Sequence, residues 1–219
     1  MQDWIELFNG RDLTGWSARG DHDWRVVGNV SLDLLDRKKL AVEEGNGVLL
    51  NGPTGRTLDL HTIASHGSCE LLLEFNLPAG SNSGVYLMGQ YEIQLLDSWE
   101  VPKSEMTFSS CGGIYARWVA ETRTAYDGHA PQTNATRPPG EWQTLRVLFH
   151  APPLGADGQP SGGARFELVE LNGATIHENV QCSGPTRGAW SEVEIAAGPL
   201  RLQGDHGPVA FRHLRMRPL

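Results

Sequence analysis

Apolar and polar residues alternate with a period of two through much of this chain, and this pattern constrains the fold more than any other feature. The segment CELLLEFNL, which begins at Cys69, places leucine and phenylalanine in one parity and mainly glutamate and asparagine in the other. The segment TLRVLFH, from Thr144, repeats the pattern. Since successive side chains of a strand point to opposite faces, both segments predict strands with one buried face. The residues expected in the core are Leu71, Leu73, Phe75, Ile93, Leu95, Val147 and Phe149.

The alternating segments are short, and turn-forming residues separate them. The chain has 26 glycines and 13 prolines among 219 residues. Asn172-Gly173 lies between two such segments and predicts a hairpin with a type I′ turn. The parity of apolar residues slips between Phe211 and Leu214, which predicts a bulge near Arg212 or His213. We therefore expect one all-β domain over residues 1–219, built as a sandwich of two antiparallel sheets.

Two segments do not follow the alternation. Residues 31–40, SLDLLDRKKL, have a spacing that could form two helical turns. Residues 99–140 form the longest irregular stretch, and it contains Trp118, Tyr126 and His129. A connection of this length in a compact domain is commonly a functional loop, so we expect an ordered loop that covers one sheet.

The charge distribution limits the classes of partner. The formal charge is −8, with 18 basic and 26 acidic residues interspersed along the chain. Nucleic acids and anionic membranes attract clustered lysine and arginine, so we expect neither partner and favour a neutral or weakly charged ligand. The sequence has no apolar run of ~20 residues and no recognisable signal peptide.

The three cysteines, Cys69, Cys111 and Cys182, lack the spacing of a zinc site. Because their number is odd, they cannot all pair within one chain. We expect buried thiols, with at most one disulfide.

The strand YEIQLLD, residues 91–97, carries the most informative polar residues. If Tyr91, Ile93 and Leu95 pack into the sandwich, Glu92 and Gln94 lie on the outer face, ~7 Å apart. The face could be an ordinary solvated surface or could hold one sugar-sized ligand. Glu70, Glu74 and Asn76 form a second polar row that could belong to the same face.

The spacing in this strand also resembles the E-x-D-x-x-E strand of laminarinase-like retaining glycosidases. Those enzymes place two carboxylates ~5 to 5.5 Å apart. Here Gln94 replaces the middle aspartate, and Asp97 lies at an odd separation from Glu92. The two acids then point to opposite faces, which does not support double displacement on this strand.

Three further segments offer candidates. Asn82 lies in GSNSG, which reads as a turn or as a ligand contact. In QGDHG, from Gln203, His206 could be a general base oriented by Asp205 or simply a turn histidine. Trp99 could lie in the core or stack on a sugar ring at the rim of a polar cleft.

Six blocks, in order along residues 7–218, closely resemble the 3-keto-disaccharide hydrolase family. They are FNGRDLTGW, GSNSGVYLMGQYEIQLLDSW, CGGIY, NATRPPGEWQTLRVLFHAP, LNGATIHENVQCSGPT and GPLRLQGDHGPVAFRHLRMRP. The resemblance implies a concanavalin A-like lectin/glucanase jelly roll with the ligand site on a concave sheet. It also implies cleavage of glycosides whose sugar C3 hydroxyl has been oxidised to a ketone, and a periplasmic or secreted location.

The family motifs mark a set of positions without fixing each role. These are Asn82, Ser83, Glu92, Gln94, Asp97, Tyr115, Gln203, Asp205 and His206. A ketone at C3 acidifies the C2 proton, so a base can remove it, the C1 substituent can leave, and water can then add. We expect Glu92 or His206 as the base, Gln94 and Asn82 as oxygen donors or hydroxyl binders, and Tyr115 as an acid. We expect Trp99 to contact substrate as well.

The predicted function is therefore a glycoside-cleaving hydrolase for a carbohydrate substrate, with no cofactor. A divalent cation could replace the donors, but no ligand set in the sequence supports one. The alternative is a non-catalytic, lectin-like domain on the same fold, which would need polar groups and aromatic platforms but no titrating residue. A third reading is an interaction domain that uses residues 99–140.

Overall fold

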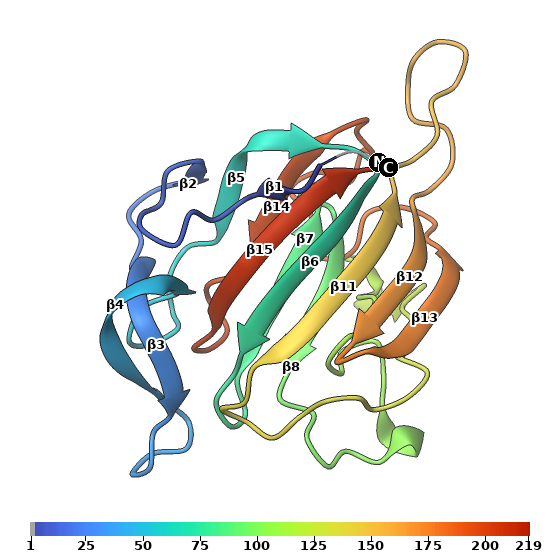
Figure 1. The fold of residues 1–219 in the computed structure, drawn as a ribbon. Coiled ribbons are helices and arrows are strands. Elements are labelled where there is room, and N and C mark those ends of the chain that lie inside the picture. Colours follow the sequence, from blue (N-terminus) through green and yellow to red (C-terminus); the bar gives the residue numbers. More distant parts are fainter. Residues whose placement is uncertain (1–2) are drawn as a thin grey trace.

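Two antiparallel sheets packed face to face make up the computed structural model, which describes residues 3–219 (Figure 1). The larger sheet has eight strands, with β1 beside β15. Its strands in spatial order are β13 (Ala174–Gln181), β12 (Arg165–Leu171), β11 (Gln143–His150), β6 (Cys69–Asn76), β15 (Ala210–Pro218), β4 (Leu40–Leu50) and β3 (Arg25–Leu32), and β1 is Ile5–Glu6.

The smaller sheet has five strands and lies behind the larger one in Figure 1. Its strands in spatial order are β2 (Trp16–Ala18), β5 (Leu60–His66), β14 (Gly198–Leu202), β7 (Asn82–Leu87) and β8 (Tyr91–Leu96). β14 thus pairs with strands from much earlier in the chain. The fold is a jelly-roll sandwich, which confirms the expected fold class.

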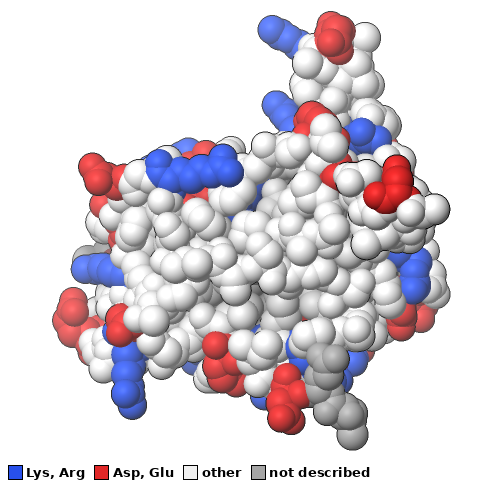
Figure 2. All heavy atoms as spheres, turned by 90° about the horizontal axis from the view of Figure 1, so that it is seen from above, with Lys and Arg blue, Asp and Glu red and all other residues white. Residues whose placement is uncertain are grey.

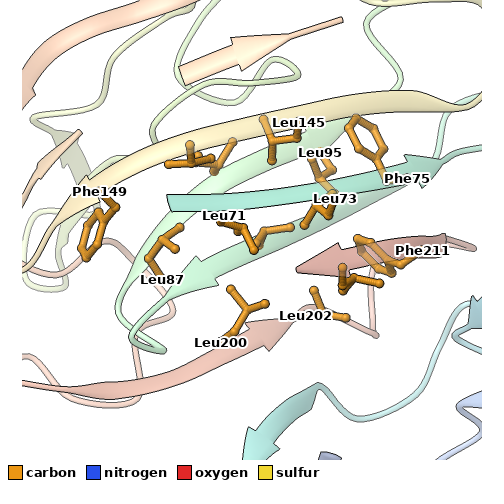
Figure 3. Packing of buried hydrophobic residues seen from close by; sticks show 14 of the residues in the cluster. Leu71, Leu73, Phe75, Leu87, Leu95, Leu145, Phe149, Leu200, Leu202 and Phe211 are labelled. Carbon is orange, nitrogen blue, oxygen red and sulfur yellow. The ribbon is translucent and has the colours of Figure 1, made fainter. Parts of the chain in front are cut away.

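The space between the sheets is filled by the apolar parity of their strands, as Figure 3 shows. All seven residues that the alternation placed in the core are fully buried. Phe149 also packs against the rings of Tyr91 and Phe166, with centroids 5.5 and 5.2 Å away. The strand parity predicted from the sequence is confirmed.

The predicted hairpin and bulge are also present. Asn172 and Gly173 have φ values of 53° and 81° between β12 and β13, as a type I′ turn requires. The pairing of β15 with β6 shifts between Arg212 and Arg215. His213, within this shift, has a φ of 51°.

The helical expectation for residues 31–40 is wrong. This segment is the end of β3, a turn, and the start of β4. The Asp33 carboxylate accepts hydrogen bonds from the backbone N–H groups of Leu35 and Asp36, at 2.7 and 3.0 Å. Aspartate stabilises such a turn through local side-chain bonds, and these compete with helix formation.

The second polar row does not share a face with Glu92. Glu70 and Glu74 lie on β6, on the outer side of the larger sheet, where arginines neutralise them. Arg146 Nε lies 2.7 Å from Glu70, and Arg212 Nε lies 2.7 Å from Glu74. Alternation gives the face of a strand but not its sheet, and this expectation is corrected.

Residues 99–140 are ordered and extend the smaller sheet beyond β8. Ile114 forms bridges with Ile93 and with His129. The segment also contains the short 3-10 helix η1 (Lys103–Glu105) and the two-stranded hairpin of β9 (Arg117–Val119) and β10 (Thr124–Tyr126).

All three cysteines are buried free thiols. Burial raises the pKa of each thiol to about 12. The structure therefore places no disulfide among them.

The surface agrees with the charge pattern of the sequence. On the face seen in Figure 2, acidic and basic side chains lie singly or in small groups, and no continuous basic patch is visible. Within residues 3–219, no helix is both long and apolar enough to cross a membrane.

Candidate functional site

A cavity of about 270 Å³ lies on the outer face of the five-stranded sheet. The strands β7 and β8 supply its floor, and segments that follow other strands supply its walls. The residues that line it are Asn82, Tyr86, Glu92, Gln94, Tyr115, Arg187, Gly188, Gln203 and His206.

The floor follows directly from strand geometry. Tyr91, Ile93 and Leu95 point into the core, so Glu92 and Gln94 must point outward. On β7 the residue opposite Gln94 is Gly84. A Cβ atom at Gly84 would lie 2.1 Å from Glu92 Oε1. The missing side chain therefore leaves the space that the Glu92 carboxyl occupies.

Glu92 is the one carboxylate among the described residues that line the cavity, and only 3% of it is exposed. Burial raises its pKa to about 8. A hydrogen bond with the Tyr86 hydroxyl and the nearby charge of Arg201 act in the opposite direction. Glu92 thus carries its proton at neutral pH and can exchange it in the range where many enzymes work.

Arg201, on β14, packs against the floor residue Tyr86. Its guanidinium carbon lies 3.6 Å from the centroid of the Tyr86 ring. Its Nη2 donates to the Gly188 carbonyl at 2.8 Å, and its Nη1 lies 3.5 Å from Asp59 Oδ2. Burial lowers the pKa of this guanidinium, which remains charged at neutral pH.

Amide groups cover another part of the floor. Gln94 Nε2 donates to Asn82 Oδ1 at 3.1 Å, which leaves Gln94 Oε1 and Asn82 Nδ2 for a ligand. The Gln203 Oε1 atom is buried and has no hydrogen-bond partner among the described residues. Buried polar atoms are rarely left unpaired, so these groups suit a ligand rich in hydroxyls.

Tyr115 forms the wall beyond β8. Its ring meets Phe108 edge to face, with centroids 5.3 Å apart. Burial and the nearby Glu92 carboxyl raise the pKa of Tyr115, so its hydroxyl keeps its proton and can donate it. Arg187 lies beside it, with the guanidinium 3.9 Å from the Trp118 ring centroid.

His206 lies on the rim, in the loop after β14. Its Nδ1 is 2.5 Å from Asp205 Oδ1. This contact fixes the imidazole and leaves Nε2 unengaged by Asp205. His206 lines the cavity, and Asp205 lies just outside it.

The structure brings together six of the residues selected from the sequence. They are Asn82, Glu92, Gln94, Tyr115, Gln203 and His206. Four others do not line the cavity, and one of them, Asp205, lies just outside it. Ser83 points inward and donates to the Gln203 carbonyl at 2.9 Å, Asp97 accepts from the Gly80 N–H at 2.9 Å, and Trp99 is 42% exposed.

Sequence reasoning missed Tyr86, Arg187, Gly188 and Arg201. Tyr86 shares the parity of Asn82 on one strand, so the alternation could have identified it. Arg201 lies opposite Tyr86 only because β14 pairs with β7. Arg187 and Gly188 lie in a loop, and no local pattern marks them.

Within residues 3–219, no group of three or more histidine, cysteine, aspartate or glutamate side chains is arranged to hold a metal ion. The cavity combines one protonated carboxyl, two phenols, an imidazole and several amides, with Arg187 in its lining and Arg201 against the Tyr86 ring.

A jelly-roll sandwich with such a cavity on its smaller sheet defines a glycosidase-like or carbohydrate-binding protein. Residues 3–217 match the 3-keto-alpha-glucoside-1,2-lyase-like domain, and the chain belongs to that family. No curated protein matches this chain.

Solved structures of similar fold include proteins from Parabacteroides distasonis ATCC 8503 that are provisionally assigned as glycosyl hydrolases. One is 24% identical, with a TM-score of 0.67, and the match covers 99% of this chain and 84% of that one. Another is 22% identical, with a TM-score of 0.63, and covers 99% of this chain and 100% of that one. At this identity, the likeness shows the shared fold.

Proposed function

We propose that the protein cleaves 3-keto-glycosides in this cavity, by elimination followed by hydration. The observation that carries the proposal is the buried Glu92 carboxyl, whose pKa of about 8 suits proton transfer, at the floor of a cavity lined with hydroxyl-binding groups. The family match supports the same chemistry.

The reaction needs two proton transfers in its first half. A base takes the C2 proton, the C2–H electron pair forms the C1=C2 bond, and the C1–O bond breaks. An acid gives a proton to the departing oxygen. Water then adds at C1 of the enone and a proton returns to C2, so the products are a 3-keto sugar and an alcohol.

The residues of the cavity can be assigned to these steps. His206, oriented by Asp205, is the base through Nε2, and Glu92, protonated at neutral pH, is the acid. Tyr115 and Asn82 donate hydrogen bonds to the oxygen that becomes an enolate. Gln94 and Gln203 bind substrate hydroxyls. This route needs no second carboxylate beside Glu92, unlike double displacement.

A lectin-like function is the second candidate, because the three amides would bind a sugar without any reaction. The raised pKa of Glu92 supports the enzyme over the lectin-like function, since a group that titrates near neutral pH serves proton transfer and is not required for binding alone.

Solvent deuterium tests the route directly. If elimination occurs, turnover of a 3-keto-glucoside in D2O places deuterium at C2 of the released sugar, which NMR detects. A parallel sample of the released sugar without protein corrects for spontaneous exchange. Turnover that leaves hydrogen at C2 would contradict elimination, and binding without turnover would favour the lectin-like function.

A further inference from the structure

A second hollow adjoins the cavity at its rim. It has a volume of about 210 Å³, and its lining residues are Arg19, Thr57, Leu58, Asp59, Trp190 and Asp205. Asp205 is bonded to His206, which lines the cavity itself. The two hollows therefore meet at this pair of residues.

Arg201 contacts residues that line both hollows. Its guanidinium contacts Tyr86, on the floor of the cavity, and lies 5.1 Å from the ring centroid of Trp190, in the second hollow. It also pairs with Asp59. Each hollow is smaller than the ~300 Å³ at which drug-sized sites begin, so each suits one sugar ring.

A third hollow adjoins the second one, and the second and third hollows together are called the trough. The third hollow has a volume of about 520 Å³ and shares Thr57, Leu58 and Asp205 with the second. Its other lining residues are Asp21, His22, Asp23 and Arg56. Hydrogen bonds fix its walls: the Asp23 N–H donates to Thr57 Oγ1 at 2.8 Å, and Arg56 Nη1 donates to the Asp205 carbonyl at 2.9 Å.

The trough is lined mainly by polar and charged residues, and its acidic groups outnumber its basic ones. Arg19 and Arg56 face it together with Asp21, Asp23, Asp59 and Asp205. Carboxylates accept from hydroxyls and guanidinium groups donate to them, so this mixture suits a neutral chain of sugars better than an anionic one. On the opposite side of the cavity, Tyr115 occupies the wall beyond β8.

We propose that the three hollows bind a neutral oligosaccharide of at least three rings, with the 3-keto ring at its non-reducing end in the cavity. The remaining rings leave together through the second and third hollows, so the protein removes one terminal ring at each turnover. This inference rests on the proposed function for the identity of the reacting ring.

Leu58 offers a way to block the trough without touching the cavity. It is 44% exposed and lies where the second and third hollows meet. Leu58→Trp fills that junction. Leu154→Trp is the matched control, because Leu154 is 58% exposed in the loop after β11 and lines none of the three hollows.

The experiment measures kcat/KM for three substrates that are oxidised at C3 of the non-reducing glucose: a methyl glucoside, a disaccharide and a trisaccharide. For the wild type we expect an increase of roughly tenfold or more from the methyl glucoside to the trisaccharide, because remote rings contribute binding energy. Leu58→Trp should lose this increase and keep turnover of the methyl glucoside, which also shows that the variant folds. Leu154→Trp should behave like the wild type.

Equal kcat/KM for all three substrates would overturn the trough proposal, and so would a Leu58→Trp variant that keeps the preference for the trisaccharide. If the wild type converts none of the substrates, the proposed function fails instead. Titration with the unoxidised trisaccharide then decides on the trough alone. Binding that Leu58→Trp weakens and Leu154→Trp preserves supports it, and binding that neither variant changes, or no binding, overturns it.

Discussion

Gly84 leaves the space that the Glu92 carboxyl occupies, because a Cβ atom at residue 84 would lie 2.1 Å from Glu92 Oε1 and 2.9 Å from Glu92 Cδ. The two residues lie on neighbouring strands, with Gly84 opposite Gln94 and Glu92 opposite Tyr86. A residue without a side chain in the middle of a strand thus makes room for the central acid of the cavity.

Gly84→Ala should therefore displace the Glu92 carboxyl while the strand remains paired. We expect turnover of a 3-keto-glycoside to fall by roughly tenfold or more, because small displacements of reacting groups are costly. Gly67→Ala is the control, since its nearest contact would be 3.4 Å away. Full activity in Gly84→Ala would show that the position of the carboxyl is not critical.

The pH dependence of the rate tests the role of Glu92 as an acid. Its pKa of about 8 means that the protonated form disappears as the pH rises through that value. The wild-type kcat/KM should then fall above about pH 8. A rate that increases through the same range would indicate that Glu92 acts as the base, and the roles of Glu92 and His206 would be exchanged.

The pH dependence of stability provides an independent check. In the unfolded chain Glu92 ionises near its ordinary pKa of 4.5, whereas the folded protein keeps the proton up to about pH 8. Unfolding releases a proton between these values, so stability falls as the pH rises through this range. The Glu92→Gln variant has no group that releases this proton on unfolding. Its stability relative to the wild type should therefore increase by ~4 kcal/mol between pH 5 and pH 9. Denaturant unfolding at both pH values measures the difference, and a constant difference would contradict the raised pKa.

The sequence predicted the strand faces well because parity is a local property. The alternation predicted the outward positions of Glu92 and Gln94, and the parity slip predicted the register shift near His213. The Asn172-Gly173 pair predicted the hairpin. Parity does not show which sheet a strand joins. For that reason Glu70 appeared to share a face with Glu92, although the two lie on opposite sides of the sandwich.

The rest of the cavity depends on long-range pairing. Arg201 reaches Tyr86 only because β14 inserts between β5 and β7, and Gly188 reaches Arg201 through a loop. Glu92 titrates near pH 8 because the folded chain buries it. Neither the pairing nor the burial can be read from the residues next to Glu92 in the sequence.

The core provides a test of the strand assignment itself. Phe75 and Phe149 are fully buried between the sheets. Replacement of either by alanine removes a ring and leaves a cavity, which should cost ~3 to 5 kcal/mol of unfolding free energy. Leu154→Ala, at an exposed position, should cost little. A loss below about 1 kcal/mol for Phe75→Ala or Phe149→Ala would contradict the packing shown in Figure 3.

The most direct test of the account compares wild type and Glu92→Gln on a 3-keto-glucoside and on the same glucoside without the ketone. Glutamine keeps the shape of the side chain but cannot titrate, so turnover of the keto substrate should fall by ~100-fold or more while KM changes little. The wild type should turn over the unoxidised glucoside poorly, because its C2 proton is not acidic and the cavity lacks a carboxylate pair. Unchanged turnover in Glu92→Gln, or a wild type that prefers the unoxidised glucoside, would contradict elimination through Glu92.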